Sequence, residues 1–569
     1  MDKKEVAHIL GEISAFLELK GENPFKSRAY SNASRIIENI EGDISELVES
    51  GELLKIKGIG SGISEKITEI VKTGKLEYYE ELKKTIPSGH IEMLKIPGIG
   101  SKRIKTLFEK FDIKSVGELE YACKENRLIE LDGFGVKSQE NILKGIENYK
   151  KYREQYLFSE ALNSAEKIYN KLKNHKDIIR ICIAGSLRRK KEIVKDIDII
   201  ASSKNSKSVM DFFASLEEVN SITAKGETKT SIVLKTGINA DLRIVSDKEY
   251  PYALHHFTGS KEHNTIMRSR AKKMEMKMNE YGIFKGDKIV LCKDEVEIFG
   301  ALKLHFIPPE VREGLDEVDY AEKNEFPKFI EDSDIKGIIH IHSNYSDGIN
   351  AIEELAKAIE KMGYSYLGIA DHSKSAFYAK GLSEERIIEQ HKEIDELNRK
   401  YKNVRILKGI EVDILPNGEL DYPDDVLKTF DFVIASVHSK FGMSENDMTN
   451  RIMKAINNKY VNILGHITGR LLLAREPYKI DIKKVVEEAS RNNVTIELNA
   501  NPYRLDIDWR ELKYVYEHNG KICINPDAHN IEGINDVKYG IGIARKGWTT
   551  PDKVINTFSY EEIMKVFEK

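Results

Sequence analysis

Two apolar segments of the sequence carry pairs of side chains that bind metal ions well. The segment DIDII places Asp196 and Asp198 two residues apart, and GIIHIH places His340 and His342 at the same spacing. Both segments read as β-strands, in which residues i and i+2 share one face. Burying like charges or unpaired imidazoles is costly, and a bound cation relieves that cost. Taken singly, solvated edge-strand acids and core histidines with local partners stay open as alternatives.

The aspartate pair has neighbours that suit a site for Mg²⁺ and phosphate. A third acid, Asp241, lies between apolar residues in INADLRIVS, and the apolar strand before the pair runs into the Gly185–Ser186 dipeptide. Magnesium prefers carboxylate oxygens together with substrate phosphates. We therefore expect Asp241 on an adjoining strand and a site for magnesium and phosphate at this sheet.

The histidine pair opens a longer series of metal-binding residues. After residue 335, apolar strands ending in histidine or acid alternate with helical stretches, a pattern that predicts a closed (β/α) barrel with its site at the carboxyl ends of the strands. Imidazole and carboxylate without thiolate suit Zn²⁺ or Mn²⁺, and so many side chains indicate two or three ions, as in multimetal phosphoesterases. The expected ligands are His340, His342, Asp347, His372, Glu411, His438, His466, Asp527 and His529.

The first 150 residues contain a repeated glycine turn. LKIKGIGSGISEKI (54–67) and LKIPGIGSKRIKTL (94–107) share one hydrophobic frame, and residues 129–143 are a looser copy with Gly133 and Gly135. Glycines permit the tight turn and bring backbone N–H groups to a phosphate at the next helix's N-terminus. The repeats resemble the helix-hairpin-helix motif, which holds DNA backbone, whereas a plain linker between bundled helices is the alternative.

Composition limits the class of protein. With 569 residues the chain is too long for one core, and three to five domains are expected. Residues 1–300 carry a net charge of +5 and residues 301–569 one of −9, which indicates a front half that meets polyanions. The four scattered cysteines predict a reducing, cytoplasmic setting. No apolar run is long enough to predict a membrane span. We expect a monomer, because no feature of the sequence requires a larger assembly.

The front half resembles family X DNA polymerases. The segments GSLRR with DID, ADLRI, and HHFTGSKEHNTIMR (255–268) are similar to that family's nucleotidyltransferase palm and thumb, over about residues 1–317. The resemblance implies gapped or primer-template DNA and dNTPs as substrates, and DNA repair, including base excision repair, as the function. It implies two Mg²⁺ or Mn²⁺ ions on the catalytic Asp196, Asp198 and Asp241.

The same resemblance assigns further roles. The implied nucleotide-site residues are Gly185, Ser186, Arg189, His256, Phe257, Gly259, Asn264 and Arg268. The implied DNA contacts are Lys26, Tyr30, Gly58, Gly60, Gly98 and Gly100. Lys66 aligns with a lysine that some members use as a Schiff-base nucleophile in deoxyribose phosphate removal, although Gly62 replaces a second lysine of that pocket.

The back half resembles the PHP (polymerase and histidinol phosphatase) domain. All nine positions of its ligand pattern are present, which implies two or three Mn²⁺ or Zn²⁺ ions (or Fe) and 3′→5′ exonuclease activity. Abasic-site endonuclease or 3′-phosphatase activity stays open, and Arg470 and Lys440 are expected to contact the substrate phosphate. A PHP small-molecule phosphatase and a non-templated nucleotidyltransferase are the rival functions.

These patterns predict a multidomain chain of α+β and α/β type. The expected domains are a helix-hairpin-helix DNA-binding domain (1–88), a second helix-hairpin-helix region (89–150), a nucleotidyltransferase palm (151–250), a thumb (251–317), a linker (318–334) and a distorted (β/α) barrel PHP domain (335–569).

Overall fold

The computed structural model describes residues 3–40, 44–96, 98–129, 131, 133–150 and 154–568, so the expected domain limits at residues 1, 151 and 569 fall outside the described residues. The chain divides into two compact units: Met1–Lys124 with Leu131–Tyr149, and Glu125–Glu130 with Lys150–Lys569. Each unit is described by itself. No described helix is both long and apolar enough to span a bilayer.

The first unit is helical. Glycines with left-handed φ (Gly58 at +102°, Gly98 at +87°) make the turns before α4 and α7, and Gly60 and Gly100 are the extended N-cap residues of these helices. The repeated segments therefore form a turn followed by a helix. The helices are α1 (Lys3–Leu19), α2 (Pro24–Asn39), α3 (Ile44–Glu49), α4 (Ser61–Thr73), α5 (Glu77–Lys84), α6 (Ser88–Met93), α7 (Ser101–Phe111), α8 (Val116–Lys124) and α9 (Val136–Lys150).

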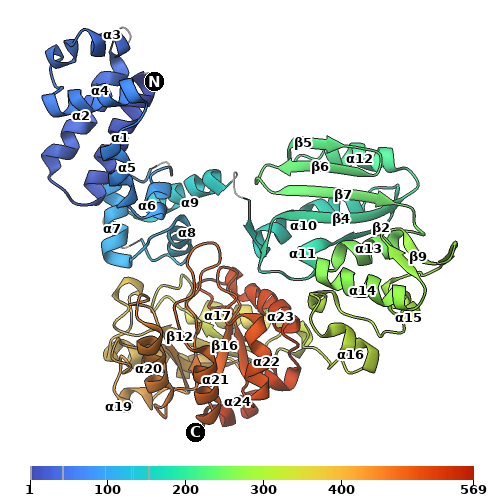
Figure 1. Ribbon diagram of the computed structural model, residues 1–569. Helices are drawn as coiled ribbons and strands as arrows, with labels where there is room; N and C mark the ends of the chain where they lie inside the picture. Colours follow the sequence, from blue (N-terminus) through green and yellow to red (C-terminus); the bar gives the residue numbers. More distant parts are fainter. Residues whose placement is uncertain are drawn as a thin grey trace. The chain divides into compact units, whose positions relative to one another are not determined.

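The second unit begins with a five-stranded sheet in the order β2-β4-β7-β6-β5, shown in green in Figure 1. Only β4 and β7 run parallel within it; the other pairs are antiparallel. The strands are β2 (Ile178–Ile183), β4 (Asp196–Ser203), β5 (Val219–Lys225), β6 (Lys229–Leu234) and β7 (Asn239–Val245), with helices α10 (Phe158–Lys173), α11 (Gly185–Arg188) and α12 (Ser206–Ala214). The short strands β1 (Tyr156–Leu157) and β3 (Ile193–Val194) pair separately.

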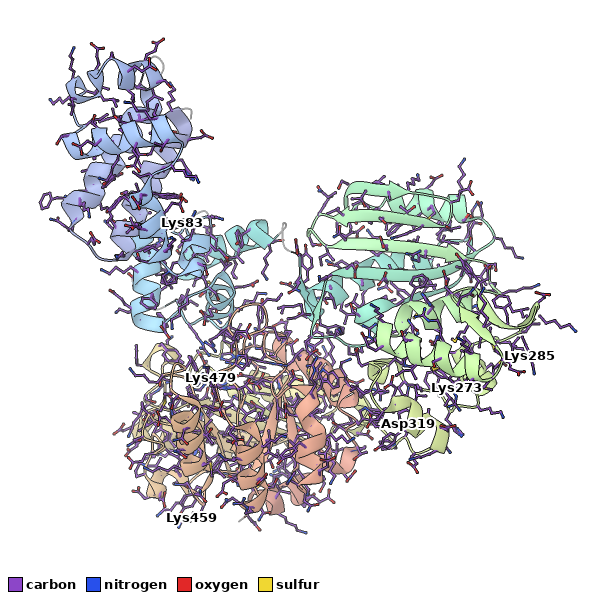
Figure 2. The ribbon with its side chains drawn as sticks, viewed as in Figure 1. Lys83, Lys273, Lys285, Asp319, Lys459 and Lys479 are labelled. Carbon is purple, nitrogen blue, oxygen red and sulfur yellow. The ribbon has the colours of Figure 1, made fainter. Side chains whose placement is uncertain are left out.

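A small helical and three-stranded region follows this sheet. Its elements are α13 (Tyr250–Thr258), α14 (Lys261–Lys273), β8 (Lys277–Asn279), β9 (Gly282–Lys285), β10 (Lys288–Val290), α15 (Glu295–Ala301) and α16 (Glu317–Lys323). Figure 2 shows that charged side chains such as Lys273, Lys285 and Lys459 lie on the outside of the second unit, and all three are exposed.

The rest of the chain is a seven-stranded parallel barrel, which confirms the barrel predicted from the strand–helix alternation. Its strands follow chain order, and a parallel bridge between Ile341 and Ala528 brings the last strand's end back to the first. The strands are β11 (Gly337–Ile341), β12 (Tyr366–His372), β13 (Arg405–Asp413), β14 (Phe432–Ser436), β15 (Ile463–Leu464), β16 (Thr495–Asn499) and β17 (Ile522–Asn525). The helices are α17 (Ile352–Met362), α18 (Glu384–Lys400), α19 (Asp424–Leu427), α20 (Glu445–Ile456), α21 (Ile482–Arg491), α22 (Trp509–Glu517), α23 (Val537–Lys546) and α24 (Tyr560–Phe567).

Candidate metal sites

The structure brings the three expected aspartates together on two strands. Asp196 and Asp198 share one face of β4, and Asp198 lies directly opposite Asp241 of the parallel strand β7. Burial, followed by Asp196 and Asp241, raises the pKa of Asp198 to about 6. Burial and Asp241 likewise raise the pKa of Asp196. The carboxylates disfavour each other's charge, which is the condition that a divalent cation relieves, so these residues fit Mg²⁺ or Mn²⁺.

A glycine is required beside this site. Gly185 opens α11 with φ +62°, and a Cβ at this position would lie 2.3 Å from Asp198 Oδ2. Ser186 is the next residue, in the first turn of α11, and its side chain is half-buried. The Gly-Ser dipeptide therefore allows the helix backbone to approach the aspartates closely.

Arg189 is buried and bonded to the FTGS segment (257–260). Its Nη1 donates to the Thr258 carbonyl at 2.7 Å, and its Nε donates to Glu313 Oε1 at 3.1 Å. Arg189, which is expected to bind a triphosphate, therefore already has two protein partners. Its neighbour Arg188 donates to the Thr258 hydroxyl at 2.7 Å and to Glu295 at 2.6 Å.

The FTGS segment joins α13 to α14, and Asn264 holds it. Asn264 Nδ2 donates to the His256 carbonyl at 2.7 Å and to the Gly259 carbonyl at 3.2 Å. Phe257 lies against Arg243, whose guanidinium is 4.5 Å from the ring centre. Arg268 is exposed one helical turn beyond Asn264, and the half-buried His256 has its pKa lowered by burial.

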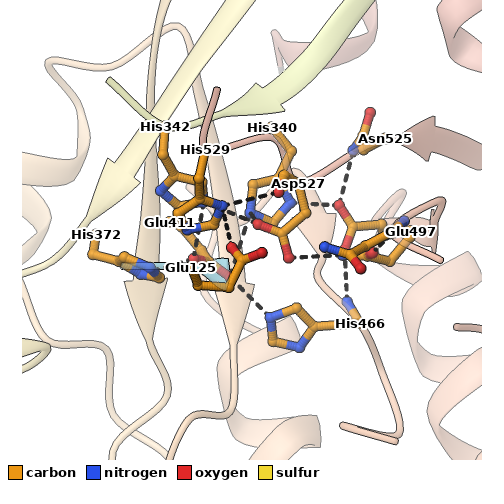
Figure 3. A network of polar contacts seen from close by, with 12 residues as sticks. Glu125, His340, His342, His372, Glu411, His466, Glu497, Asn525, Asp527 and His529 are labelled. Atoms are coloured by element: carbon orange, nitrogen blue, oxygen red, sulfur yellow. Dashed lines mark hydrogen bonds and ion pairs between the residues drawn. The ribbon is translucent and has the colours of Figure 1, made fainter. Parts of the chain in front are cut away.

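The nine expected ligands of the barrel converge at the carboxyl ends of its strands, as Figure 3 shows for most of them. Three groups of side chains lie close enough to hold a metal ion: His342 with Asp347, His372 and His529; His340 with His342 and Asp527; and His372 with Glu411 and His438. His466 Nε2 lies 3.0 Å from Glu411 Oε1. Figure 3 also labels Glu125, which pairs with His529.

The chemistry of these groups fits bound metal. Among the described residues, His466 Nδ1 is buried without a hydrogen-bond partner, and the buried His340 Nε2 and Asp347 Oδ2 have no partner closer than 3.4 Å. Unpaired polar atoms at such depth are costly unless a cation uses them. Against the effect of burial, His529 and His372 hold the pKa of Asp347 well below its ordinary value. Burial and the neighbouring His529 and His372 lower the pKa of His342 to about 3, so its imidazole is neutral and able to bind a metal.

Positive φ values occur at three of these ligands, and His466 has the smallest, +21°. His340 and Asp527 have left-handed φ values of +63° and +52°, which non-glycine residues rarely adopt. Such strain costs on the order of 1–3 kcal/mol per residue and persists where the surrounding contacts hold it. It aims both side chains into the cluster.

Carboxylates that the sequence interpretation omitted orient two of the histidines. Glu497 of β16 is fully buried, with Oε1 2.6 Å from His340 Nδ1 and Oε2 accepting from the His466 backbone N–H at 2.8 Å. Asp413 of β13 lies 2.5 Å from His438 Nδ1. A carboxylate on the second ring nitrogen fixes the tautomer of a metal-binding histidine. The apolar strand TIELNA carried the signal for Glu497 without showing which histidine it meets.

The two expected phosphate contacts of the barrel differ in accessibility. Arg470 donates to Asp508 at 2.7 Å and to the Arg504 carbonyl at 2.9 Å, so it braces a loop and has little free donor capacity. Its expected role as a phosphate contact is not supported. Lys440 is exposed, with φ +60°.

In the first unit, Lys26 and Lys66 both lie near the ring of one tyrosine, Tyr78. The Nζ atoms of Lys26 and Lys66 are 5.4 Å and 5.1 Å from the ring centre of Tyr78. Tyr30, expected at the DNA surface, is 5% exposed and stacks on Tyr78 at 6.3 Å. It is therefore a core residue that supports the lysine pair, and the DNA contact expected at Tyr30 stays a prediction.

The chain joins a mixed sheet with three aspartates to a parallel barrel with a histidine–carboxylate cluster. This combination defines a class of two-site, metal-dependent proteins of phosphate chemistry. Family models match a helix-hairpin-helix domain at residues 1–76, a SAM-like helix-hairpin-helix tandem at 91–148, a DNA polymerase beta thumb at 253–313 and a PHP domain at 339–501.

Whole-chain similarity makes the assignment specific. The chain is 40% identical over 568 residues to the DNA polymerase/3′-5′ exonuclease PolX of Bacillus subtilis, covering 99% of each chain. The chain belongs to the PolX family. Probable phosphatases of Thermoanaerobacter sp. (strain X514) and Clostridium acetobutylicum are each 33% identical over 28% of this chain, covering 67% and 63% of their own lengths.

Proposed function

We propose that this chain is a repair DNA polymerase that fills short gaps from dNTPs at its aspartate site and degrades 3′ ends at its barrel site. The observation that carries the proposal is the presence of two separate carboxylate-containing clusters in one chain of the PolX family. The divalent cations, when bound, supply electrophilic stabilisation of phosphate and ease deprotonation of the attacking hydroxyl.

The chain's own residues divide the work of the polymerase site. Asp196, Asp198 and Asp241 hold Mg²⁺ or Mn²⁺, and Gly185 lets the backbone of the next helix approach a phosphate. Ser186 and Arg189 bind triphosphate oxygens, while Asn264 keeps the FTGS segment in shape. Arg268, exposed on α14, contacts the template.

The barrel cluster holds two or three ions of Mn²⁺, Zn²⁺ or Fe through its nine ligands, and it acts on the phosphodiester at a 3′ end. Glu497 and Asp413 orient His340 and His438. Lys26, together with the glycine turns of the first unit, binds the DNA backbone, and Lys66 is the candidate lyase nucleophile. Borohydride trapping on abasic DNA tests the lyase assignment, since a nucleophilic Lys66 forms an adduct that Lys66→Ala lacks.

Further parts of the proposal concern the setting. The chain works as a monomer in a reducing cytoplasm, in keeping with its free cysteines Cys123, Cys182, Cys292 and Cys523. Its domains are those expected above, with the palm at 151–250, the thumb at 251–317 and the PHP domain at 335–569.

One panel of assays tests the two activities. A 5′-labelled primer on gapped DNA is incubated with Mg²⁺ or Mn²⁺, with and without dNTPs, for the wild type, Asp198→Ala and His342→Ala. Asp198→Ala abolishes extension and spares 3′ degradation, and His342→Ala does the reverse. Loss of both activities in either variant contradicts two independent sites. Extension without a template favours a non-templated nucleotidyltransferase.

A further inference from the structure

A lysine of the barrel lies buried among residues of the polymerase half. Lys546 is the last residue of α23, and it is 1% exposed. Its Nζ donates to the Arg189 carbonyl at 3.0 Å and to the Glu310 carbonyl at 3.2 Å, and it pairs with Glu313. All these residues belong to the same compact unit. An ammonium at this depth is costly unless it is paired, so its partners indicate a specific role.

The carboxylate that Lys546 meets is the one that holds Arg189. Glu313 Oε1 accepts from Arg189 Nε at 3.1 Å and also pairs with Lys546 Nζ. The same guanidinium donates through Nη1 to the Thr258 carbonyl of the FTGS segment at 2.7 Å. The ammonium, the carboxylate and the guanidinium thus form one buried chain that ends at Arg189, whose backbone N–H donates to the Gly185 carbonyl at 3.3 Å.

The charges of this chain leave a positive excess. Burial would raise the pKa of Glu313, but Lys546 and Arg189 hold it below its ordinary value, so the carboxylate is ionised. Within this chain one anion lies between two cations, so Lys546, Glu313 and Arg189 together carry a net charge of +1. Without the ammonium, the carboxylate would cancel the guanidinium and hold it more tightly, and an incoming triphosphate would lose that attraction.

We propose that Lys546, a residue of the PHP barrel, is a positioning residue for the polymerase reaction: by sharing Glu313, it leaves Arg189 placed and charged for the dNTP triphosphate. The inference rests on the proposed polymerase function and on Arg189 as a triphosphate contact. It makes the barrel a structural part of the nucleotide site, apart from the barrel's own metal chemistry.

Other contacts keep α23 in place when Lys546 is altered. Arg545 Nε donates to Glu310 at 2.8 Å, and its Nη1 donates to the Ile330 carbonyl at 2.9 Å. Tyr539 packs edge-on against Phe158 at 5.9 Å. Removing one ammonium therefore leaves the helix docked. Lys538, exposed on the same helix, provides a matched control.

The test compares Lys546→Met with Lys538→Met in the full-length protein. Steady-state extension of gapped DNA gives KM for dNTP and kcat, release of 3′ nucleotides gives the barrel activity, and thermal unfolding gives stability. A hydrogen bond to a charged group is worth about 1.5–3 kcal/mol, so Lys546→Met raises KM for dNTP by roughly 10- to 100-fold. The kcat value and 3′ degradation change little, and Lys538→Met resembles the wild type in every measurement.

A double variant separates positioning from simple loss of structure. Lys546→Met with Glu313→Gln removes both charges of the pair and restores the positive excess on Arg189, so KM for dNTP returns toward the wild-type value. An unchanged KM in Lys546→Met overturns the inference, and so does a double variant as impaired as the single one. A wild type that extends no primer overturns the proposed function instead, which makes the two failures distinguishable.

Discussion

Substitution of Gly185 by alanine tests whether the close approach of helix α11 to the aspartates matters for nucleotidyl transfer. An added Cβ would lie 2.3 Å from Asp198 Oδ2, whereas ordinary contacts begin at 3.4 Å. Relief of the overlap therefore displaces the carboxylate by about 1 Å, and a misplacement of that size costs on the order of 10²-fold in rate. We expect Gly185→Ala to lower kcat for primer extension about 10²-fold.

A second glycine supplies the control for backbone strain. Gly185 has φ +62°, and the left-handed conformation costs an alanine about 1–2 kcal/mol. Gly286, in the turn between β9 and β10, has φ +58° with no atom within 4 Å of an added Cβ. Gly286→Ala therefore carries the same strain without meeting an aspartate.

The assay is steady-state gap filling for both variants, with thermal unfolding and 3′ degradation measured in parallel. Both variants lose stability, Gly185→Ala the more because of its overlap with Asp198; both retain 3′ degradation, and only Gly185→Ala loses extension. If Gly185→Ala extended primers as fast as Gly286→Ala does, the link between this glycine and the position of Asp198 would be refuted.

Three further outcomes are expected. Glu497→Gln weakens the bond that orients His340 and lowers both 3′ degradation and metal affinity by about 10- to 100-fold, measured by nuclease assay and metal titration, with primer extension as the unaffected control. Burial alone would raise the pKa of Glu295, but Arg312 and Arg188 hold it below its ordinary 4.5. The stabilisation of the fold by this ion pair is complete above pH 4.5 and is lost as the pH falls through the lower pKa of the folded state. Calorimetry therefore finds that Glu295→Gln is less stable than the wild type at pH 7 and loses less stability on acidification. Chelation of the metals abolishes 3′ degradation and lowers the unfolding temperature, because buried imidazoles such as His372 lose the bound ion. Added Mn²⁺ restores both the activity and the unfolding temperature. An unchanged unfolding temperature would contradict a structural role for the ions.

The barrel could be predicted because the pattern of apolar and polar residues that forms it lies within short segments of the sequence. A parallel strand buried on both faces needs a nearly continuous apolar run, so most of the metal ligands lie near or just after the carboxyl end of a strand. Strands β11, β12 and β14 are buried at every position, and His372 closes β12. The strand pattern and the position of the ligands are therefore two consequences of one constraint.

Long-range pairing could not be predicted in the same way. Glu497 meets His340 across 157 residues, and nothing in TIELNA specifies that partner. Tyr30 lies on an amphipathic helix beside exposed Lys26, and only packing against Tyr78 shows that its ring is internal. Arg470 is a residue type that commonly binds phosphate, but its guanidinium donates hydrogen bonds to a loop carbonyl and to Asp508.

The two sites handle negative charge in opposite ways, and this difference bears on how each uses metal. At the aspartate site, burial and then the neighbouring carboxylates raise the pKa of Asp196 and Asp198, and Asp196 is exposed, so the site is open and favours a cation. In the barrel, imidazoles hold the pKa of Asp347 and Glu411 well below their ordinary values, and nearly every ligand is buried. An open carboxylate site suits Mg²⁺ that arrives with the phosphates of a substrate, whereas a closed imidazole–carboxylate cluster suits ions that stay between turnovers.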